Sequence, residues 1–258
     1  FDEPHPEELH RALVAPMASL HFAPTRHAAA ALRREGVDPS RIHITGNSGI
    51  DALLATSERL DTDPALAADL AFRHPYAAQP RRPLLLVTVH RRENLGRRLQ
   101  AIAAALARLA AFCEAEIVLP LHPNPAVQRV LRDKLEGLDG VHLIPAVDHV
   151  TMVWLMRRAQ VLLTDSGGLQ EEAPVLGLRT LVLRQTTERT EALAAGASEL
   201  VELQADSIVS AVRRTLLRKP LRPVLPFGDG QASERIAMII HDWLGYAPDA
   251  EREVSLAP

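Results

Sequence analysis

A segment in the second half of the chain, LLTDSGGLQEEAPVLG at residues 162–177, joins an apolar run to two glycines and two glutamates. Gly167 and Gly168 let a ligand approach the backbone, and the start of a following helix offers N–H groups with partial positive charge. The hydroxyl of Ser166 adds a donor. Glu172 comes about one helical turn later, where its carboxylate can accept hydrogen bonds from a ribose diol. The segment therefore predicts a cradle for the diphosphate and ribose of a nucleotide.

The same residues are also compatible with a structural role. A Ser-Gly-Gly sequence makes a tight strand-to-helix turn, and the helix dipole favours acids such as Glu171 and Glu172 near a helix start without any ligand. Pro174 predicts an irregular or kinked first turn, or a late helix start, because proline has no backbone donor. The sequence contains neither a GxGxxG motif nor a P-loop lysine motif, so NAD and ATP are poorly supported.

A second polar cluster, HRREN at residues 90–94, follows another apolar run. Arginines such as Arg91 bind phosphate oxygens through paired hydrogen bonds, and a histidine beside them, His90, can donate to a phosphate or shuttle a proton. A single histidine after a strand is more often structural, but the neighbouring arginines favour an anion site. His122 and Arg189 follow later apolar runs. The sequence has no HExxH, CxxC or Asp-rich motif, so we expect neither a metal nor a cofactor.

The composition limits the classes of partner. The chain has 258 residues, 47% of them hydrophobic, and a net charge of −3, which gives no reason to expect nucleic acid or an anionic membrane as partner. No run reaches the ~18 apolar residues of a membrane span. The single Cys113 excludes an internal disulfide, fits a reducing cytoplasm, and lies in an apolar run that predicts a buried thiol.

The elements that must position these residues follow a regular pattern from residue 83 to about 220. Strands are expected at 83–89, 116–121, 141–145, 161–164, 180–184 and 199–203, with helices between them. One face of the first helix carries Leu99, Ile102, Leu106 and Leu109. Asn124 with Pro125 is a typical helix start, and Asp206 is expected to cap the last helix. This pattern predicts an α/β fold, a doubly wound parallel sheet covered on both faces.

The first 60 residues predict only two strands, at 20–25 and 42–47, among helices at about 6–19, 26–35 and 49–60. Two strands are too few for an independent sheet. We therefore interpret them as the C-terminal remnant of a first α/β domain whose beginning is absent. The full domain prediction is 1–60 for the remnant, 61–82 for a connector, 83–225 for an α/β domain that carries the predicted nucleotide cradle, 226–245 for a helix returning to the first domain, and 246–258 for a loose tail.

Ligands of open α/β sheets bind beyond the carboxyl ends of the strands. His90, His122, Ser166 and Arg189 all come shortly after predicted strands. We therefore expect them to line one site.

Several motifs together resemble a known family. They are HFAPT (21–25), ITGNSGIDAL (44–53), TVHRREN (88–94), TDSGGLQEEAPVLG (164–177), LVLRQTTERTEAL (181–193) and FGDGQASERI (227–236). Over about residues 5–243 the chain resembles the non-hydrolysing UDP-N-acetylglucosamine 2-epimerases. The resemblance implies a two-domain GT-B-like fold and interconversion of UDP-GlcNAc and UDP-ManNAc for cell-wall polysaccharide synthesis, through elimination and re-addition of UDP.

The resemblance also implies roles for individual residues. Catalysis falls to Glu7 and to His90, which assists departure of UDP. Substrate binding falls to Met152, Ser166, Gly167, Gly168, Glu172 and Arg189, with Met152 where many relatives stack an aromatic ring on uracil. Arg91 and His122 match a regulatory UDP-GlcNAc site of some members. The implied partners are UDP-GlcNAc or UDP, no nucleic acid, no membrane and, in the complete protein, a second copy in a homodimer.

Three family motifs, GTRPE, HGDT and EAGLR, are absent from the sequence, and Thr190 replaces a usual proline. We therefore expect a truncated chain that is inactive as an epimerase by itself. Two other functions stay open. A UDP-sugar glycosyltransferase of GT-B fold would use the same UDP site, and so would a non-catalytic UDP-binding module.

Overall fold

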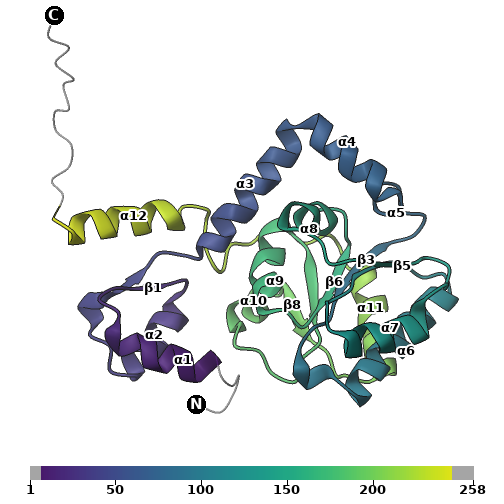
Figure 1. Cartoon of the computed structure of the whole chain (residues 1–258), viewed down its shortest axis with the longest axis horizontal. Coiled ribbons are helices and arrows are strands. Elements are labelled where there is room, and N and C mark those ends of the chain that lie inside the picture. The colour runs from purple at the N-terminus through teal and green to yellow at the C-terminus, as the bar shows by residue number, and fades with distance from the viewer. Residues whose placement is uncertain (1–6, 246–258) are drawn as a thin grey trace, which may run out of the picture. The chain divides into compact units, whose positions relative to one another are not determined.

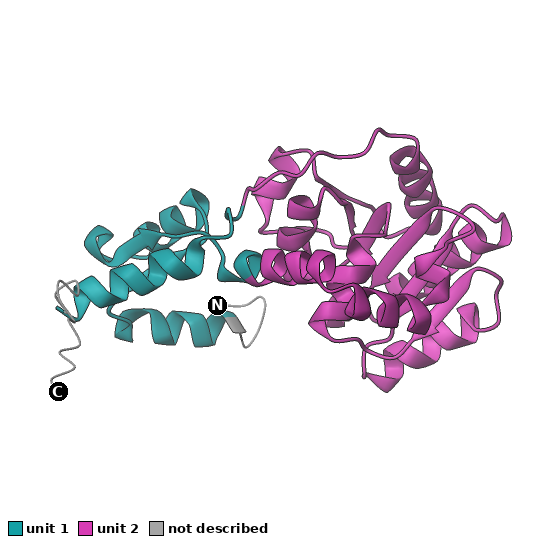
Figure 2. Ribbon diagram, turned by 90° about the horizontal axis from the view of Figure 1, so that it is seen from above, with its two compact units in different colours: residues 1–51, 227–258 teal, residues 52–226 magenta. Residues whose placement is uncertain are grey.

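The structure, a computed structural model, describes residues 7–245, with the side chain of Glu7 outside the description. The chain forms two compact units: unit 1, residues 1–51 and 227–258, and unit 2, residues 52–226 (Figure 2). Within 7–245, no helix is both long enough and apolar enough to cross a membrane.

Unit 2 is built on one six-stranded parallel sheet (Figure 1). Its strands are β3 (Leu84–Thr88), β4 (Glu116–Pro120), β5 (Val141–Ile144), β6 (Val161–Thr164), β7 (Arg179–Val182) and β8 (Ser198–Leu200). Their spatial order is β5-β4-β3-β6-β7-β8, and every neighbouring pair is parallel. Strands that connect in this way need crossovers, which the intervening helices supply.

The strand order creates one special position in the sheet. The chain steps outward from β3 to β4 and β5, then returns to place β6 beside β3. Connections leave β3 and β6 in opposite directions, and open α/β sheets bind ligands beyond the carboxyl ends of strands at such a position. Thr88 and Thr164 are paired in register, so the residues that follow them lie side by side at this edge of the sheet.

Both faces of the sheet are covered. The helices and 3₁₀ turns of unit 2 are the later part of α3 (Ser48–Thr62), α4 (Pro64–Arg73), α5 (Pro75–Ala78), η3 (Arg92–Asn94), α6 (Arg97–Ala111), α7 (Pro125–Leu135), α8 (His149–Met156), α9 (Gly167–Glu172), η4 (Ala173–Leu176), α10 (Thr190–Ala194) and α11 (Ala205–Leu216). All four apolar residues predicted on one face of α6 are buried in one cluster with Leu85 and Val87. Leu84 and Leu86, on the opposite face, are buried too. The prediction of a doubly wound parallel sheet is confirmed.

Two local predictions in unit 2 are wrong. Cys113 is exposed, with φ of 54°, because it lies in the turn between the end of α6 and the start of β4 rather than in either element. Asp206 lies inside the first turn of α11, and its carboxylate pairs with Arg108 at 2.5 Å instead of capping the helix. The predicted cap at Asn124 is confirmed, since its Oδ1 accepts a hydrogen bond from the N–H of Ala126 at 2.9 Å.

Segment 61–82 is largely helical. Asp63 caps α4 by accepting a hydrogen bond from the N–H of Leu66 at 3.0 Å, and proline occupies the first position of both α4 and α5. Proline is well tolerated there because the first helical N–H groups have no partner inside the helix.

Unit 1 contains α1 (Glu7–Val14), η1 (Ala15–Met17), β1 (His21–Ala23), α2 (Arg26–Arg34), η2 (Pro39–Arg41), β2 (Ile42–Ile44), the start of α3, and α12 (Ala232–Trp243). β1 and β2 form a two-stranded parallel sheet. The carboxylate of Asp51 accepts hydrogen bonds from the N–H groups of Ala232 and Ser233, so it caps α12 from the first turn of α3. The predicted tail at 246–258 lies outside the described residues.

Gly177 is a position where both conformation and space require glycine. It ends η4 with φ of 70°, and a Cβ there would lie 2.7 Å from the carbonyl oxygen of Leu221. Gly137 has a similar φ of 80°, but a Cβ there would have no atom of the described residues within 4 Å. We expect Gly177→Ala to lower the free energy of unfolding by about 1–3 kcal/mol more than Gly137→Ala. Urea denaturation of the two variants measures this difference, and equal losses would contradict it.

Candidate active site

The site residues of unit 2 follow the carboxyl ends of four strands. His90 follows β3, His122 follows β4, Asp165 follows β6, and Arg189 precedes α10 in the segment after β7. Because these strands are parallel neighbours, the same edge of the sheet carries all four residues.

The centre of the site is the carboxylate of Asp165, which is fully buried. It accepts hydrogen bonds from the backbone N–H groups of His90 at 3.1 Å and Arg91 at 2.9 Å, and from Nδ2 of Asn94 at 2.8 Å. The Nδ1 atom of His90 lies 3.0 Å from its Oδ1. One carboxylate after β6 therefore fixes the backbone and two side chains of the loop after β3.

The surroundings keep Asp165 ionised at neutral pH. Burial by itself would raise the pKa of this carboxyl, but hydrogen bonds from His90, Arg91 and Asn94 outweigh burial and hold the pKa below its usual range. A buried charge of this kind is stable only while its donors stay in place.

Asn94 extends the network to a third strand. Its Nδ2 also donates to the carbonyl oxygen of Leu183, just after β7, at 3.0 Å, while its buried Oδ1 has no hydrogen-bond partner among the described residues. Beneath it, the hydroxyls of Thr88 and Thr164 share a hydrogen bond of 2.6 Å, and Thr164 Oγ1 accepts from the N–H of Ser166 at 2.9 Å. The ends of β3, β6 and β7 are thus joined by side chains as well as by the sheet.

Two imidazole rings lie together at the edge of the site. The rings of His90 and His122 are stacked, with centroids 5.8 Å apart and planes 24° from parallel. Nδ1 of His122 accepts a hydrogen bond from the N–H of Asn124 at 3.1 Å. The side chain of His90 is 37% exposed, so a ligand can reach it.

The Ser-Gly-Gly turn leads directly into α9. Ser166 is its N-cap, although the Leu169 N–H to Ser166 Oγ distance of 3.5 Å is long. A Cβ on Gly167 would lie 3.1 Å from the guanidinium of Arg189, so the absence of a side chain at this position leaves space for Arg189. The φ angle of Gly167 is not positive and does not by itself require glycine. Gly168 is exposed.

Arg189 is held in place by residues of α9 and its own loop. Its Nε donates to Oε1 of Glu171 at 2.8 Å, and its Nη1 pairs with Glu188. Thr187 accepts from the N–H of Arg189 at 3.2 Å and donates to Gln170 at 2.7 Å. These contacts hold the guanidinium against the glycine turn.

Glu172 differs from its neighbour Glu171. It is partly buried, and no hydrogen bond or ion pair joins its carboxylate to another residue within 7–245. Burial raises the pKa of Glu172; the Coulombic interaction with His149 opposes this effect, and the negative charge of Glu171 adds to it. A partly buried carboxylate without a donor is suited to accept hydroxyl groups from a ligand.

The structure gives fewer polar contacts for the other predicted site residues. Met152 lies partly buried in α8, three positions after His149. Arg91 is partly buried, and its Nε has no partner in the described part of the chain. Glu7 is the first residue of α1 in unit 1, and its side chain lies outside the description.

Sequence reasoning missed two functional candidates, Asp165 and Asn94. The available signal was a lone acid directly after a buried strand, followed by glycines, together with the asparagine that ends HRREN. Neither pattern by itself says that the two side chains meet.

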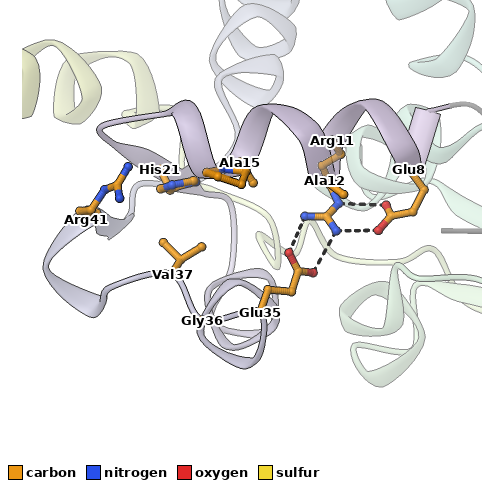
Figure 3. A pocket seen from close by; sticks show the side chains of 10 residues that line it. Glu8, Arg11, Ala12, Ala15, His21, Glu35, Gly36, Val37 and Arg41 are labelled. Carbon is orange, nitrogen blue, oxygen red and sulfur yellow. Dashed lines mark hydrogen bonds and ion pairs between the residues drawn. The ribbon is translucent and has the colours of Figure 1, made fainter.

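Unit 1 contains a separate cavity of about 550 Å³ between α1 and the segment from α2 to β2 (Figure 3). The residues that line it include Arg11, which pairs with Glu8 at 2.6 Å and with Glu35 at 2.7 Å. Arg41 also lines the cavity, and its Nε donates to the carbonyl oxygen of Ser19 at 3.1 Å. None of the residues predicted to bind the diphosphate lines this cavity, so that chemistry is assigned to unit 2.

Comparison with known proteins finds relatives in one family. A family model described as UDP-N-acetylglucosamine 2-epimerase matches residues 1–241. The probable UDP-N-acetylglucosamine 2-epimerase of Ralstonia nicotianae is 45% identical over 244 residues, which are 92% of this chain and 64% of the relative. The UDP-N-acetylglucosamine 2-epimerase of Salmonella typhimurium is 41% identical over 93% of this chain and 65% of its own length.

Solved structures agree with these relatives. The UDP-GlcNAc 2-epimerase of Neisseria meningitidis bound to UDP-GlcNAc has a TM-score of 0.88 and 35% identity, over 93% of this chain and 66% of that one. The enzyme of Methanocaldococcus jannaschii in complex with UDP-GlcNAc and UDP has a TM-score of 0.80 and 31% identity, over 94% and 66%. The chain thus spans about two thirds of the length of the proteins it matches.

The contacts of Asp165 predict a large stability effect. In Asp165→Asn, one oxygen becomes an NH₂ group among three kinds of N–H donor, so we expect a loss of about 3 kcal/mol in the free energy of unfolding. The folded-state pKa is depressed, so the stabilisation is present above the unfolded pKa of about 3.9 and is lost as pH falls through the folded value. Denaturation at pH 7 and at pH 3 measures both effects.

Asp206→Asn is the matched control, since Asp206 is an exposed aspartate with one arginine partner. We expect a change within about 0.5 kcal/mol. A similar small change for Asp165→Asn would show that the Asp165 network contributes little.

Proposed function

The chain belongs to the UDP-N-acetylglucosamine 2-epimerase family, and from this membership and its site we propose that unit 2 binds the UDP part of UDP-GlcNAc and that the complete protein interconverts UDP-GlcNAc and UDP-ManNAc. The fold is the GT-B-like α/β fold of that family. The observation that best supports the proposal is that the guanidinium of Arg189 lies against Gly167. Gly167 belongs to the short helix α9, which also carries Glu172. The carboxylate of Glu172 has no partner within 7–245.

UDP would use groups that the free chain leaves available. Ser166, Gly167 and Gly168 would lie along the diphosphate. Arg189 would exchange its exposed partner Glu188 for a phosphate oxygen, while Glu171 continues to hold its Nε. This exchange needs no large movement, because the guanidinium already lies against the glycine turn.

The remaining parts of the nucleotide have their own candidates. Glu172 would accept hydrogen bonds from the ribose hydroxyls, which offsets the cost of a partly buried charge. Met152 would pack on the uracil ring, as a thioether can. His90 would contact the phosphate that leaves with the uridine.

The proposed reaction is an elimination followed by an addition. A base removes the proton from carbon 2 of the sugar, the C–H electron pair forms the C1–C2 double bond, and the C1–O bond breaks so that UDP departs with its electron pair. UDP then adds again to 2-acetamidoglucal while carbon 2 is protonated on the opposite face. His90 stabilises the leaving phosphate, and we assign Glu7 to acid–base work on the sugar.

We further propose that Arg91 and His122 belong to a second, regulatory UDP-GlcNAc site, that the complete protein is a homodimer, and that it is located in the cytoplasm. His122 follows the strand next to that of His90, and the stacking of the two rings supports a second site beside the first. The single cysteine of the chain is compatible with a reducing compartment.

The activity is tested by proton NMR in heavy water. A protein that joins this chain to the amino-terminal third of a relative should convert UDP-GlcNAc to UDP-ManNAc and replace the carbon-2 hydrogen by deuterium. His90→Gln should slow this exchange by about 10²-fold or more. The 258-residue chain alone serves as comparison and should show no exchange. A glycosyltransferase or a binding module would leave the carbon-2 hydrogen in place, and that result would refute the proposal.

The ribose contact gives a second prediction. Glu172→Gln should weaken UDP binding by roughly ten- to hundredfold, because a hydrogen bond to a charged group contributes about 1.5–3 kcal/mol. The same variant should not lose stability. The raised pKa means that charged Glu172 destabilises the fold at neutral pH, and this penalty disappears as pH falls through the folded-state pKa.

Titration calorimetry and thermal melts at pH 7 check both parts of this prediction. Glu136→Gln is the control, since Glu136 is an exposed glutamate at the end of α7. It should change neither quantity appreciably. An unchanged UDP affinity in Glu172→Gln would remove Glu172 from the ribose site.

A further inference from the structure

We propose that Asp165 is a positioning residue for His90: it fixes the proton on Nδ1, turns Nε2 toward the ligand, and makes His90 the group that takes up a proton when a diphosphate binds. The proposal has two parts. The placement of the proton on Nδ1 of His90 does not depend on a ligand. The proton uptake rests on the UDP binding proposed above.

The contacts of Asp165 determine which nitrogen of His90 carries the proton. An ionised carboxylate only accepts hydrogen bonds, so Nδ1 at 3.0 Å from Oδ1 must be the donor. Asp165 cannot turn away, because the N–H groups of His90 and Arg91 and the Nδ2 of Asn94 hold it from the same loop. The Nε2 atom of neutral His90 then has a lone pair that no described residue uses, on a side chain that is 37% exposed.

His122 has the opposite arrangement. The N–H of Asn124 donates to its Nδ1, so Nδ1 has the lone pair and Nε2 carries the proton. Protonation of Nδ1 would break this bond and would place a second positive ring against His90, with centroids 5.8 Å apart. His122 therefore donates from Nε2 while it stays neutral, and of the two rings it is His90 that has a carboxylate to stabilise an imidazolium.

This difference has a consequence for anion binding. The lone pair on Nε2 of neutral His90 repels a phosphate oxygen, whereas the protonated ring donates to it. Binding of a diphosphate should therefore draw a proton from solvent onto Nε2, and the resulting imidazolium lies between the phosphate and Asp165.

The other groups around His90 do not compete for this proton. Asp165 after β6 and His122 after β4 face the ring. Its own loop adds Arg91, Arg92 and Glu93, and Glu93 pairs with Arg184 at 3.2 Å. The arginines stay charged throughout the physiological range.

Proton uptake is measured by calorimetric titration of UDP at pH 7.5 in two buffers with different heats of ionisation. The wild-type chain should take up more protons than His90→Gln, by up to one proton. Its affinity should correspondingly gain up to about tenfold for each pH unit lowered, relative to that variant. UDP itself also titrates, but its contribution is the same for every variant and cancels in the comparison.

Three further variants separate positioning from other roles. Asp165→Asn should reduce the proton uptake to that of His90→Gln, whereas His122→Gln should keep it even if UDP binds more weakly. His142→Gln is the matched control, because His142 also contacts a buried carboxylate, Glu116, at 2.6 Å, but lies on β5 away from the site. Full uptake in a folded Asp165→Asn variant would overturn the proposal, as would its loss in His142→Gln.

The proton on His90 can be located without any variant of Asp165. In the chain labelled with ¹⁵N-histidine and free of UDP, His90 should show a protonated Nδ1 and His122 a protonated Nε2, with signals assigned from His90→Gln and His122→Gln. A chain that binds no UDP would refute the proposed function. In that case a His90 protonated only at Nε2 would overturn the role of Asp165, and one protonated at Nδ1 would support it.

Discussion

A buried negative charge must be surrounded by hydrogen-bond donors. In this protein that requirement determines how the loops at the carboxyl ends of β3, β6 and β7 are arranged. Asp165 is fully buried where β6 ends, beside the end of β3. To keep it ionised, the chain after β3 must turn so that the N–H groups of His90 and Arg91 point inward. The same turn brings Asn94 to the carboxylate and to the end of β7. Three strands that alternate with helices in the sequence are thereby tied together at the point where the strand order reverses.

Two arginines at this edge are paired with glutamates. Arg189 has Glu171 and Glu188, and Arg184 has Glu93 and Glu188. The groups that lack a partner among the described residues include Nε of Arg91, Oδ1 of Asn94 and the carboxylate of Glu172. Under the proposed function, Glu172 accepts hydroxyl groups of the nucleotide and Nε2 of His90 carries a proton to a phosphate. Under that proposal, a site whose charges largely cancel can still favour one orientation of a nucleotide sugar.

The sequence predicted the sheet because each strand and helix has its own local pattern. The buried strands, the apolar face of α6 and the cap at Asn124 all depend on residues a few positions apart. The order of the strands does not, since it depends on which distant segments become neighbours. For the same reason Asp165 was overlooked: its partners His90 and Asn94 lie 75 and 71 positions earlier in the chain. The prediction that Cys113 is buried was wrong for the opposite reason. The local composition stays apolar through the turn between α6 and β4, although the turn itself is exposed.

The turn LLTDSGGLQEEAPVLG combines these constraints in one segment. α9 is short because Pro174 cannot donate a backbone hydrogen bond, so the chain tightens into η4 and reverses at Gly177 before β7. Glu171 and Glu172 therefore lie in the last turn of α9, where successive side chains point about 100° apart. Glu171 faces the loop before α10 and holds Arg189, while Glu172, unpaired within the described part of the chain, lies within reach of Gly168. Under the proposed function, the two adjacent glutamates take separate tasks: Glu171 holds the cation for the phosphates and Glu172 accepts the ribose hydroxyls. The early end of the helix keeps both beside the glycine turn.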